Sequence, residues 1–190
     1  MSDQGTQGLL SPFLRHRRIR AVAPWLRGRV LDYGCGSGAL AAHVAAADYV
    51  GFDVDADALA IARRRHPHHR FLAAVPDGEC FDTVACLAVI EHVAQPDAFL
   101  RELAGRVRPG GCVVLTTPHP AYEFVHDLGA RIGVFSRDAS EEHEALLDRA
   151  ALCALAERER LEIAAYRRFL GGANQLFVAR RRAPTRGECA

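Results

Sequence analysis

Short apolar runs alternate along the chain with longer segments in which apolar residues recur every three or four positions. The short runs predict β-strands, and the longer segments predict amphipathic helices. We expect strands at residues 29–33, 49–52, 70–74, 83–87 and 112–116, with helices between them at residues 39–47, 56–65 and 96–108. Because strands that alternate with helices are typical of βαβ units, the pattern predicts a parallel sheet.

Both ends of the chain depart from this alternation. A Ser11-Pro12 pair is typical of a helix start and predicts a helix before the first strand. Towards the C-terminus, a helix predicted over residues 141–160 leads into strands at 161–169 and 175–180, separated by Gly171-Gly172. Two strands around a glycine pair are typical of a hairpin.

We expect one domain over residues 1–190, because this length suits a single hydrophobic core. Its expected parts are an N-terminal helical cap (1–25), a cofactor-binding core (26–117), a substrate-cap insertion (118–145), a C-terminal helix and hairpin (146–182) and a flexible tail (183–190).

Composition narrows the function classes. Lys and Arg number 24 against 23 Asp and Glu, and this balance gives no bulk electrostatic support for a nucleic-acid or membrane partner. No apolar run reaches the roughly 18 residues that a bilayer span needs. The six cysteines form no C-x-x-C pair, and no signal-peptide pattern opens the sequence. We therefore expect a cytoplasmic protein with reduced thiols.

The segment VLDYGCGSG, residues 30–38, carries the strongest functional signal. Alternating glycines after a strand let the backbone bend tightly and approach a ligand. Their G-x-G-x-G spacing differs from the G-x-G-x-x-G of dinucleotide sites. Asp32 precedes them, and its carboxylate would repel a pyrophosphate and attract an ammonium group. Asp53 ends the second predicted strand, where doubly wound folds present an acid to ribose.

The segment VLDYGCGSG, with GFD about 15 residues further on, resembles the first two motifs of class I S-adenosylmethionine-dependent methyltransferases. The resemblance extends through FDTVACLAVIEHV, LRELAGRVRPGGCVVLTTP and NQLFVARR, and so covers residues 26–182. Together with the strand pattern, it implies an α/β, Rossmann-like, doubly wound seven-stranded sheet. That sheet is expected to be mostly parallel, with an antiparallel C-terminal hairpin strand and helices on both faces.

The resemblance also implies a binding site for S-adenosyl-L-methionine. The glycines would lie against the methionyl part, Asp32 near its amino group, and Asp53 at the ribose hydroxyls. The implied cofactor-binding set is Asp32, Gly34, Cys35, Gly36, Gly38, Asp53, Val54, Leu87 and Ala88. Relatives of the ubiquinone type have two glutamates before a histidine after strand four; here Ala88 replaces the first, leaving Glu91-His92, and we expect no metal.

We expect methyl transfer to a small-molecule acceptor, more at oxygen than at nitrogen or carbon, with the acceptor free or presented by a partner protein. An oxygen acceptor would need a base. His119 is the first candidate because it follows the fifth strand at the ligand edge, and His143 or, less directly, His126 are the others. Two alternatives stay open: a same-fold cyclase or binding module that uses the cofactor without methylating, and an NAD-dependent oxidoreductase.

Overall fold

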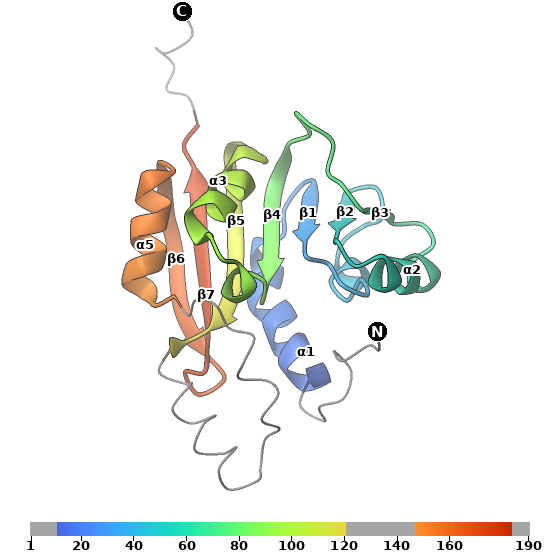
Figure 1. Ribbon diagram of the computed structural model, residues 1–190, viewed down its shortest axis with the longest axis horizontal. Coiled ribbons are helices and arrows are strands. Elements are labelled where there is room, and N and C mark those ends of the chain that lie inside the picture. The colour runs from blue at the N-terminus through green and yellow to red at the C-terminus, as the bar shows by residue number, and fades with distance from the viewer. Residues whose placement is uncertain (1–10, 121–146, 184–190) are drawn as a thin grey trace, which may run out of the picture.

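The computed structural model describes residues 11–120 and 147–183, and its centre is one seven-stranded sheet with the order β3-β2-β1-β4-β5-β7-β6 (Figure 1). The strands are β1 Val30–Tyr33, β2 Tyr49–Phe52, β3 Arg70–Leu72, β4 Phe81–Leu87, β5 Val107–Pro118, β6 Leu161–Phe169 and β7 Asn174–Arg181. The helices are α1 Ser11–Val22, α2 Ala56–Arg65, α3 Pro96–Gly105 and α5 Arg149–Arg158, with 3₁₀ turns η2 Ala23–Trp25, η3 Ala41–His43 and η4 Ile90–His92.

Strand β7 is the antiparallel strand of the sheet. It pairs antiparallel with β5 on one side and with β6 on the other, whereas the pairs among β1 to β5 are parallel. The mostly parallel sheet with a C-terminal antiparallel hairpin strand is therefore confirmed. The hairpin turns at Gly171 and Gly172, which both have positive φ, as the glycine pair predicts.

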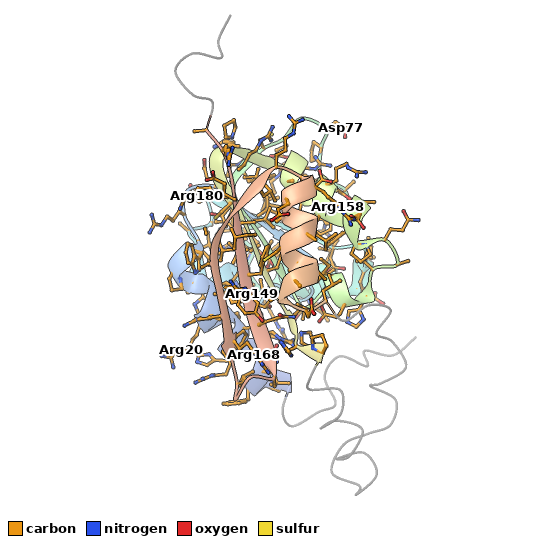
Figure 2. The ribbon with its side chains drawn as sticks, turned by 90° about the vertical axis from the view of Figure 1, so that its left-hand side faces the viewer. Arg20, Asp77, Arg149, Arg158, Arg168 and Arg180 are labelled. Carbon is orange, nitrogen blue, oxygen red and sulfur yellow. The ribbon has the colours of Figure 1, made fainter. Side chains whose placement is uncertain are left out.

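The helices cover both faces of the sheet, which also confirms the expected fold class. Helices α3 and α5 pack on one face, and the side view shows α5 lying along the β6–β7 hairpin (Figure 2). The opposite face is covered by α1, η3 and α2.

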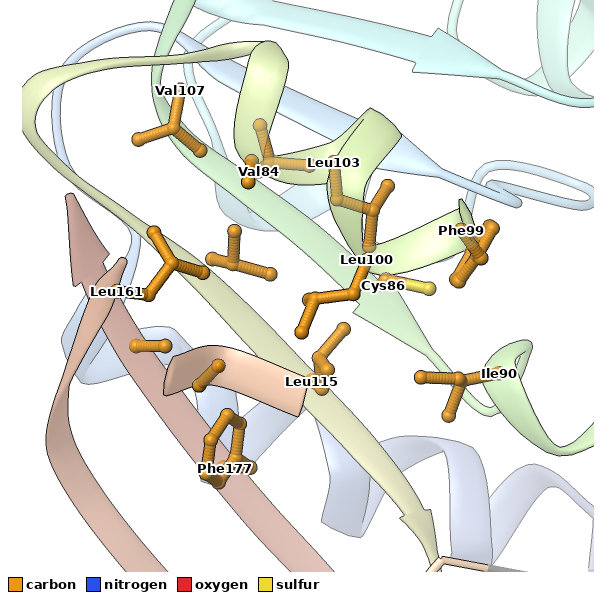
Figure 3. Close-up of a cluster of buried hydrophobic side chains, with 14 of the residues drawn as sticks. Val84, Cys86, Ile90, Phe99, Leu100, Leu103, Val107, Leu115, Leu161 and Phe177 are labelled. Atoms are coloured by element: carbon orange, nitrogen blue, oxygen red, sulfur yellow. The ribbon is translucent and has the colours of Figure 1, made fainter. Parts of the chain in front are cut away.

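The core on the α3 and α5 face is the larger cluster of buried apolar side chains (Figure 3). Leu100 and Leu103 of α3 are fully buried among Val84 of β4, Leu115 of β5 and Phe177 of β7. Truncating such a leucine to alanine costs about 2–5 kcal/mol of stability. This core therefore packs the parallel strands and the C-terminal hairpin against the same two helices.

The helix predicted over residues 39–47 was wrong. These residues form turns and the 3₁₀ turn η3, which ends when Val44 becomes extended. The physical reason is the shortness of the neighbouring strands: β1 and β2 have four residues each, and such a strand spans only about 13 Å. A compact turn therefore suffices to return the chain to the start of β2.

Boundaries of other elements also differ from expectation. Helix α3 ends at Gly105, and β5 begins at Val107, which pairs with Phe81 of β4. The apolar Val107, which fits the helical spacing, is therefore a strand residue, because pairing with β4 buries it completely. Helix α5 runs from Arg149 to Arg158 with Asp148 as its N-cap, so it begins later and ends earlier than the helix predicted over residues 141–160, of which residues 141–146 lie outside the described residues.

The parallel strands direct all their carboxyl ends to the same edge of the sheet, which we call the carboxyl edge. From β1 the chain continues to β2 and β3 on one side, whereas β4 and β5 lie on the other. Open α/β sheets bind ligands beyond this edge, where the strand order reverses. Within the described part of the chain, no helix is both long and apolar enough to cross a membrane.

Candidate functional site

The glycine loop after β1 adopts a backbone that only glycine takes easily. Gly34 has φ 79° and Gly36 has φ 50°, both in the left-handed region. A Cβ on Gly34 would lie 2.5 Å from a methyl carbon of Val89, whereas a Cβ on Gly36 would meet nothing within 4 Å. Gly34 is therefore needed for packing, and Gly36 leaves open space at the carboxyl edge.

Asp53 at the end of β2 is held against this loop. Its Oδ2 accepts a hydrogen bond from the backbone N–H of Gly36 at 2.7 Å, and its Oδ1 accepts from that of Asp55 at 3.0 Å. Because each carboxylate oxygen has two lone pairs, both can still accept a bond from a ligand hydroxyl. The next residue, Val54, leaves 85% of its surface exposed and offers an apolar contact beside Asp53.

Asp32 is a buried carboxyl, with 3% of its surface exposed. The hydroxyl of Tyr49, the first residue of β2, donates to its Oδ2 at 2.7 Å. Burial raises the pKa of Asp32 to about 7, the bond from Tyr49 opposes this rise, and the charge of Asp53 adds to it. Near neutral pH, Asp32 is therefore partly neutral and partly ionised.

The sequence interpretation missed Tyr49. A buried tyrosine needs a hydrogen-bond partner for its hydroxyl, so a tyrosine at the start of an otherwise apolar strand was a usable signal. The ring of Tyr49 packs edge-on against Phe71 and His69, and these contacts hold its hydroxyl at Asp32.

Cys35, predicted at the cofactor, lies within the loop and is buried. Burial raises the pKa of its thiol far above the ordinary value, and the charges of Asp32 and Asp53 act in the same direction. The thiol therefore stays protonated, which suits a packing residue and does not suit a nucleophile. At Gly38, at the end of the loop, an added Cβ would lie 3.1 Å from the ring of Phe71 and 3.2 Å from the Cβ of Ala62, so a side chain there would be crowded.

The end of β4 reaches the same edge through Leu87 and Ala88. Ala88 has φ 57°, a conformation that costs a non-glycine residue about 1–2 kcal/mol. Its backbone N–H donates to the carbonyl of Thr116 on β5 at 2.8 Å. Backbone strain of this kind tends to occur at functional sites.

His119 lies just beyond β5, with its backbone N–H bound to the carbonyl of Ala173 at 2.9 Å. Burial lowers the pKa of its imidazole below 6.5, the positive charge of Arg168 lowers it further, and Asp148 opposes them. The imidazole is therefore neutral at pH 7 and able to take a proton. His143, like His126, lies outside the described residues.

Gln175, at the start of β7, joins three elements around His119. Its buried side-chain amide donates to the carbonyls of Pro118 and Leu147, and its Oε1 accepts from the hydroxyl of Tyr166 at 3.0 Å. These bonds fix the end of β5, the start of α5 and β6 relative to one another. Gln175 lies in the segment NQLFVARR that carries the family resemblance, but the sequence pattern gave this residue no role.

Glu91, which follows β4 in η4, is buried and accepts a hydrogen bond from the hydroxyl of Thr117 at 3.0 Å. Arg18 of α1 donates to the side chain of Asn174, the first residue of β7, at 3.0 Å. Burial lowers the pKa of Arg18, and the negative charge of Glu91 opposes the change. Among the described residues, no three His, Cys, Asp or Glu side chains are gathered as a metal site requires.

The sequence matches a family described as "Methyltransferase domain" over residues 9–165. It is similar to the ubiquinone biosynthesis O-methyltransferase of Dinoroseobacter shibae, with 35% identity over 112 residues, which cover 53% of this chain and 45% of the relative. The chain spans about half the length of the curated relatives it matches.

Two solved structures share the fold. Magnesium protoporphyrin IX methyltransferase from Synechocystis PCC 6803, with bound SAH, matches with a TM-score of 0.74 at 19% identity, over 94% of this chain and 90% of that one. A putative methyltransferase from Haloferax volcanii, in complex with the Trm112 methyltransferase activator, matches with a TM-score of 0.71 at 15% identity, over 90% of this chain and 93% of that one. At these identities the likeness shows the fold alone.

Proposed function

Because the chain belongs to the methyltransferase domain family, we propose that it transfers the methyl group of S-adenosyl-L-methionine to an oxygen atom of a small-molecule acceptor. The observation that carries this proposal is the pairing of Asp53 with the backbone N–H of Gly36. In doubly wound folds an acid at the end of the second strand binds ribose. Here such an acid is bonded to a glycine turn that has open space at the carboxyl edge.

The residues around the loop fit this cofactor. Asp53 would accept bonds from the ribose hydroxyls, and exposed Val54 would lie against the adenine. Gly36 would allow the methionyl part to approach the backbone, because its missing Cβ leaves open space. Ionised Asp32 would attract the amino group, and Leu87 with Ala88 would border the methionyl side.

The same loop is unsuited to a pyrophosphate, which weighs against the NAD-dependent alternative. Dinucleotide sites offer loop N–H groups and an α-helix N-terminus to the phosphates. Here the N–H groups of Gly34 and Cys35 both donate to the carbonyl of Phe52, and that of Gly36 donates to Asp53. No α-helix follows this loop in the described structure, because η3 takes its place.

When bound, the cofactor supplies a methyl group activated by a sulfonium, so the leaving group needs no acid. The task of the protein is then to hold the acceptor oxygen in line, which supplies most of the acceleration in such displacements. We propose that His119 takes or orients the acceptor proton, because its imidazole is neutral at pH 7 and lies beyond β5. His143 remains a second candidate for this role.

We also propose that the acceptor is small, because most described residues build the sheet and the cofactor half of the edge. The relatives named ubiquinone biosynthesis O-methyltransferase support an oxygen acceptor. Presentation of the acceptor by a partner protein, a single-domain organisation and a cytoplasmic location are part of the same proposal. The complex of the Haloferax volcanii protein with an activator supports the idea of a protein partner.

The decisive experiment incubates the protein with methyl-labelled S-adenosylmethionine and pools of hydroxylated small molecules. Label transfer together with release of S-adenosylhomocysteine is the expected result. Binding of S-adenosylhomocysteine without any transfer would favour the cyclase or binding-module alternative. Thermal stabilisation by NAD alone, with none by S-adenosylhomocysteine, would contradict the proposal.

A further inference from the structure

Strand β5 extends beyond its neighbour β4 at the carboxyl edge. Its pairing with β4 ends at Thr116, whereas its pairing with β7 continues to Pro118. In the part of the chain that the structure describes, Thr117 and Pro118 thus have a strand partner on one side only. Because Pro118 also lacks an N–H to donate, strand pairing holds this end weakly. His119 follows directly, so any motion of the strand end would move the proposed base.

Three consecutive residues, 117–119, are nevertheless each held by a hydrogen bond from a different element. The hydroxyl of Thr117 donates to Oε2 of Glu91 in η4 at 3.0 Å. The carbonyl of Pro118 accepts from the side-chain amide of Gln175 on β7 at 3.1 Å. The backbone N–H of His119 donates to a carbonyl of the hairpin turn at 2.9 Å. Side-chain and turn bonds therefore take the place of the second strand partner.

The acceptor for Thr117 is a buried carboxylate. Glu91 and Thr117 each leave 1% of their surface exposed. Burying a charge is costly, and a neutral acceptor would satisfy a threonine hydroxyl with a smaller penalty. A hydrogen bond to a charged acceptor is, however, about twice as strong as a neutral one. The structure therefore places a costly group where it holds the strand end firmly.

The neighbouring Thr116 shows that burial alone does not call for such a bond. Its side chain is also fully buried, yet its hydroxyl has no hydrogen-bond partner among the described residues. Thr116 pairs with both β4 and β7, so its backbone is already fixed. The bonded hydroxyl is found at Thr117, where pairing with β4 has ended. This contrast links the bond to Glu91 with the position of the strand end.

We propose that Glu91 and Gln175 are positioning residues for His119 in methyl transfer. Glu91 acts through Thr117, and Gln175 acts through Pro118. This inference rests on the proposed function, in which His119 takes or orients the acceptor proton, and adds the residues that hold this histidine in place. Both side chains are buried, so neither would touch the acceptor. A fixed position matters because a displacement of about 1 Å at a reacting group can lower a rate about a hundredfold.

The test follows the imidazole of His119 by NMR in protein saturated with S-adenosylhomocysteine, and the signal is identified by its loss in His119→Ala. Burial and the charge of Arg168 hold the pKa of His119 below 6.5. Thr117→Val removes the hydroxyl and keeps the shape of the side chain. We expect the pKa of His119 to rise towards 6.5, because a released strand end is less buried. Exchange of the His119 backbone N–H should become about tenfold faster.

Two control variants separate the bond from other effects of substitution. Thr117→Ser keeps the hydroxyl and should behave as the unmodified protein does. Thr116→Val is the matched control, because it removes a buried threonine hydroxyl that has no partner in the described structure. It should change neither the pKa of His119 nor the exchange rate. Gln175→Met removes the bond to Pro118 and should act as Thr117→Val does, so the test does not depend on the folding of one variant.

Turnover provides the functional readout. With an acceptor found by label transfer, Thr117→Val should lower kcat about tenfold, because the base is no longer held in place. The KM for S-adenosylmethionine should stay the same, since the bond removed does not involve the glycine loop. Thr117→Ser should retain the kcat of the unmodified protein.

Rapid exchange of the His119 N–H in the unmodified protein would overturn the proposal, and this measurement needs no variant. An unchanged pKa of His119 in folded Thr117→Val and Gln175→Met, or the same change in Thr116→Val as in Thr117→Val, would also overturn it. If no acceptor is methylated, or if His119→Ala keeps full activity, the proposed function fails instead. The NMR results distinguish these cases, because they require no acceptor.

Discussion

The two halves of the carboxyl edge are built in opposite ways. The half at β1 and β2, where we propose that the cofactor binds and which we call the cofactor half, carries Asp32 and Asp53. The half at β5 to β7, where we propose that the acceptor binds and which we call the acceptor half, carries His119 and Gln175. The two acids of the cofactor half suit a donor that carries an ammonium and a sulfonium.

The two halves also differ in how far apart in the chain their partners are. In the cofactor half, Gly36 and Asp53 are 17 residues apart, as are Asp32 and Tyr49. In the acceptor half, Gln175 is 57 residues from Pro118, and Arg18 is 156 residues from Asn174. The cofactor half is therefore a local unit of two adjacent strands and the turns between them, and the acceptor half exists only after the C-terminal hairpin has joined the sheet.

The largest effect is expected from Gly36→Val in the cofactor half. A branched side chain at φ 50° would be strained and would fill the open space at the loop. We expect binding of S-adenosylhomocysteine to be lost in calorimetry, while the protein stays folded by circular dichroism.

The matched control is Gly78→Val, because Gly78 also has positive φ and open space for a Cβ, but lies in the turn between β3 and β4. Both variants should lose similar stability, and only Gly36→Val should lose the ligand. Normal binding by a folded Gly36→Val protein would mean that the loop is structural.

In the acceptor half, His119→Ala should lower turnover by about a hundredfold or more, the usual scale for a general base. Affinity for S-adenosylmethionine should stay the same, because His119 lies beyond β5 and away from the glycine loop. Turnover of the unmodified protein should rise with pH through a pKa below 6.5, since burial and Arg168 lower the pKa of His119.

The variant Arg168→Gln tests whether His119 is the group that titrates in the pH–rate profile. Removing its charge should move the rising limb of the pH–rate profile to higher pH, and His68→Ala, at an exposed turn, should leave the profile unchanged. A His119→Ala variant with full activity would remove His119 from the mechanism and direct attention to His143.

Asp53→Ala should weaken cofactor binding by about 1–3 kcal/mol, the range for a lost hydrogen-bond partner that carries charge. The expected cost in stability is small, because Asp53 follows the last residue of β2 and is half-exposed. Calorimetry with S-adenosylhomocysteine measures the change, and Asp57→Ala in the first turn of α2 is the control acid. Unchanged affinity in Asp53→Ala would refute the ribose assignment.

The smallest effect is expected from Tyr49→Phe, which tests the state of Asp32. Since the ionised carboxylate attracts the ammonium, affinity for S-adenosylhomocysteine should rise with pH across about 7, the pKa of Asp32. Loss of the Tyr49 hydroxyl removes a bond that stabilises the ionised form, so the rise should move to higher pH. At pH 7 the loss in affinity should be about 0.5–1.5 kcal/mol.

The same group affects stability without ligand. Because the folded-state pKa of Asp32 is raised from an ordinary value of 3.8 to about 7, its contribution to stability is present at low pH and is lost as pH rises through this window. Asp32→Asn should remove that slope from urea titrations. Tyr33→Phe, whose hydroxyl binds exposed Glu102, is the control for Tyr49→Phe and should leave both pH profiles unchanged.

The sequence by itself determined the succession of strands along the chain, the position of the glycine loop and the acids beside it. These features are visible because strand and helix periods, glycine spacing and strand ends are local patterns. The helix expected over residues 39–47 does not form. Because β1 and β2 are short, the connection between them has only a short distance to cross, and the residues of the connection themselves give no sign of that distance.

Only the tertiary structure decided how the acceptor half is arranged. Gln175 is bonded to Pro118, and Arg18 is bonded to Asn174, only because folding packs together segments that are distant in the chain. A single sequence carries no local sign of such contacts, because a buried polar side chain is specified by the partner that satisfies it, and folding brings that partner into place.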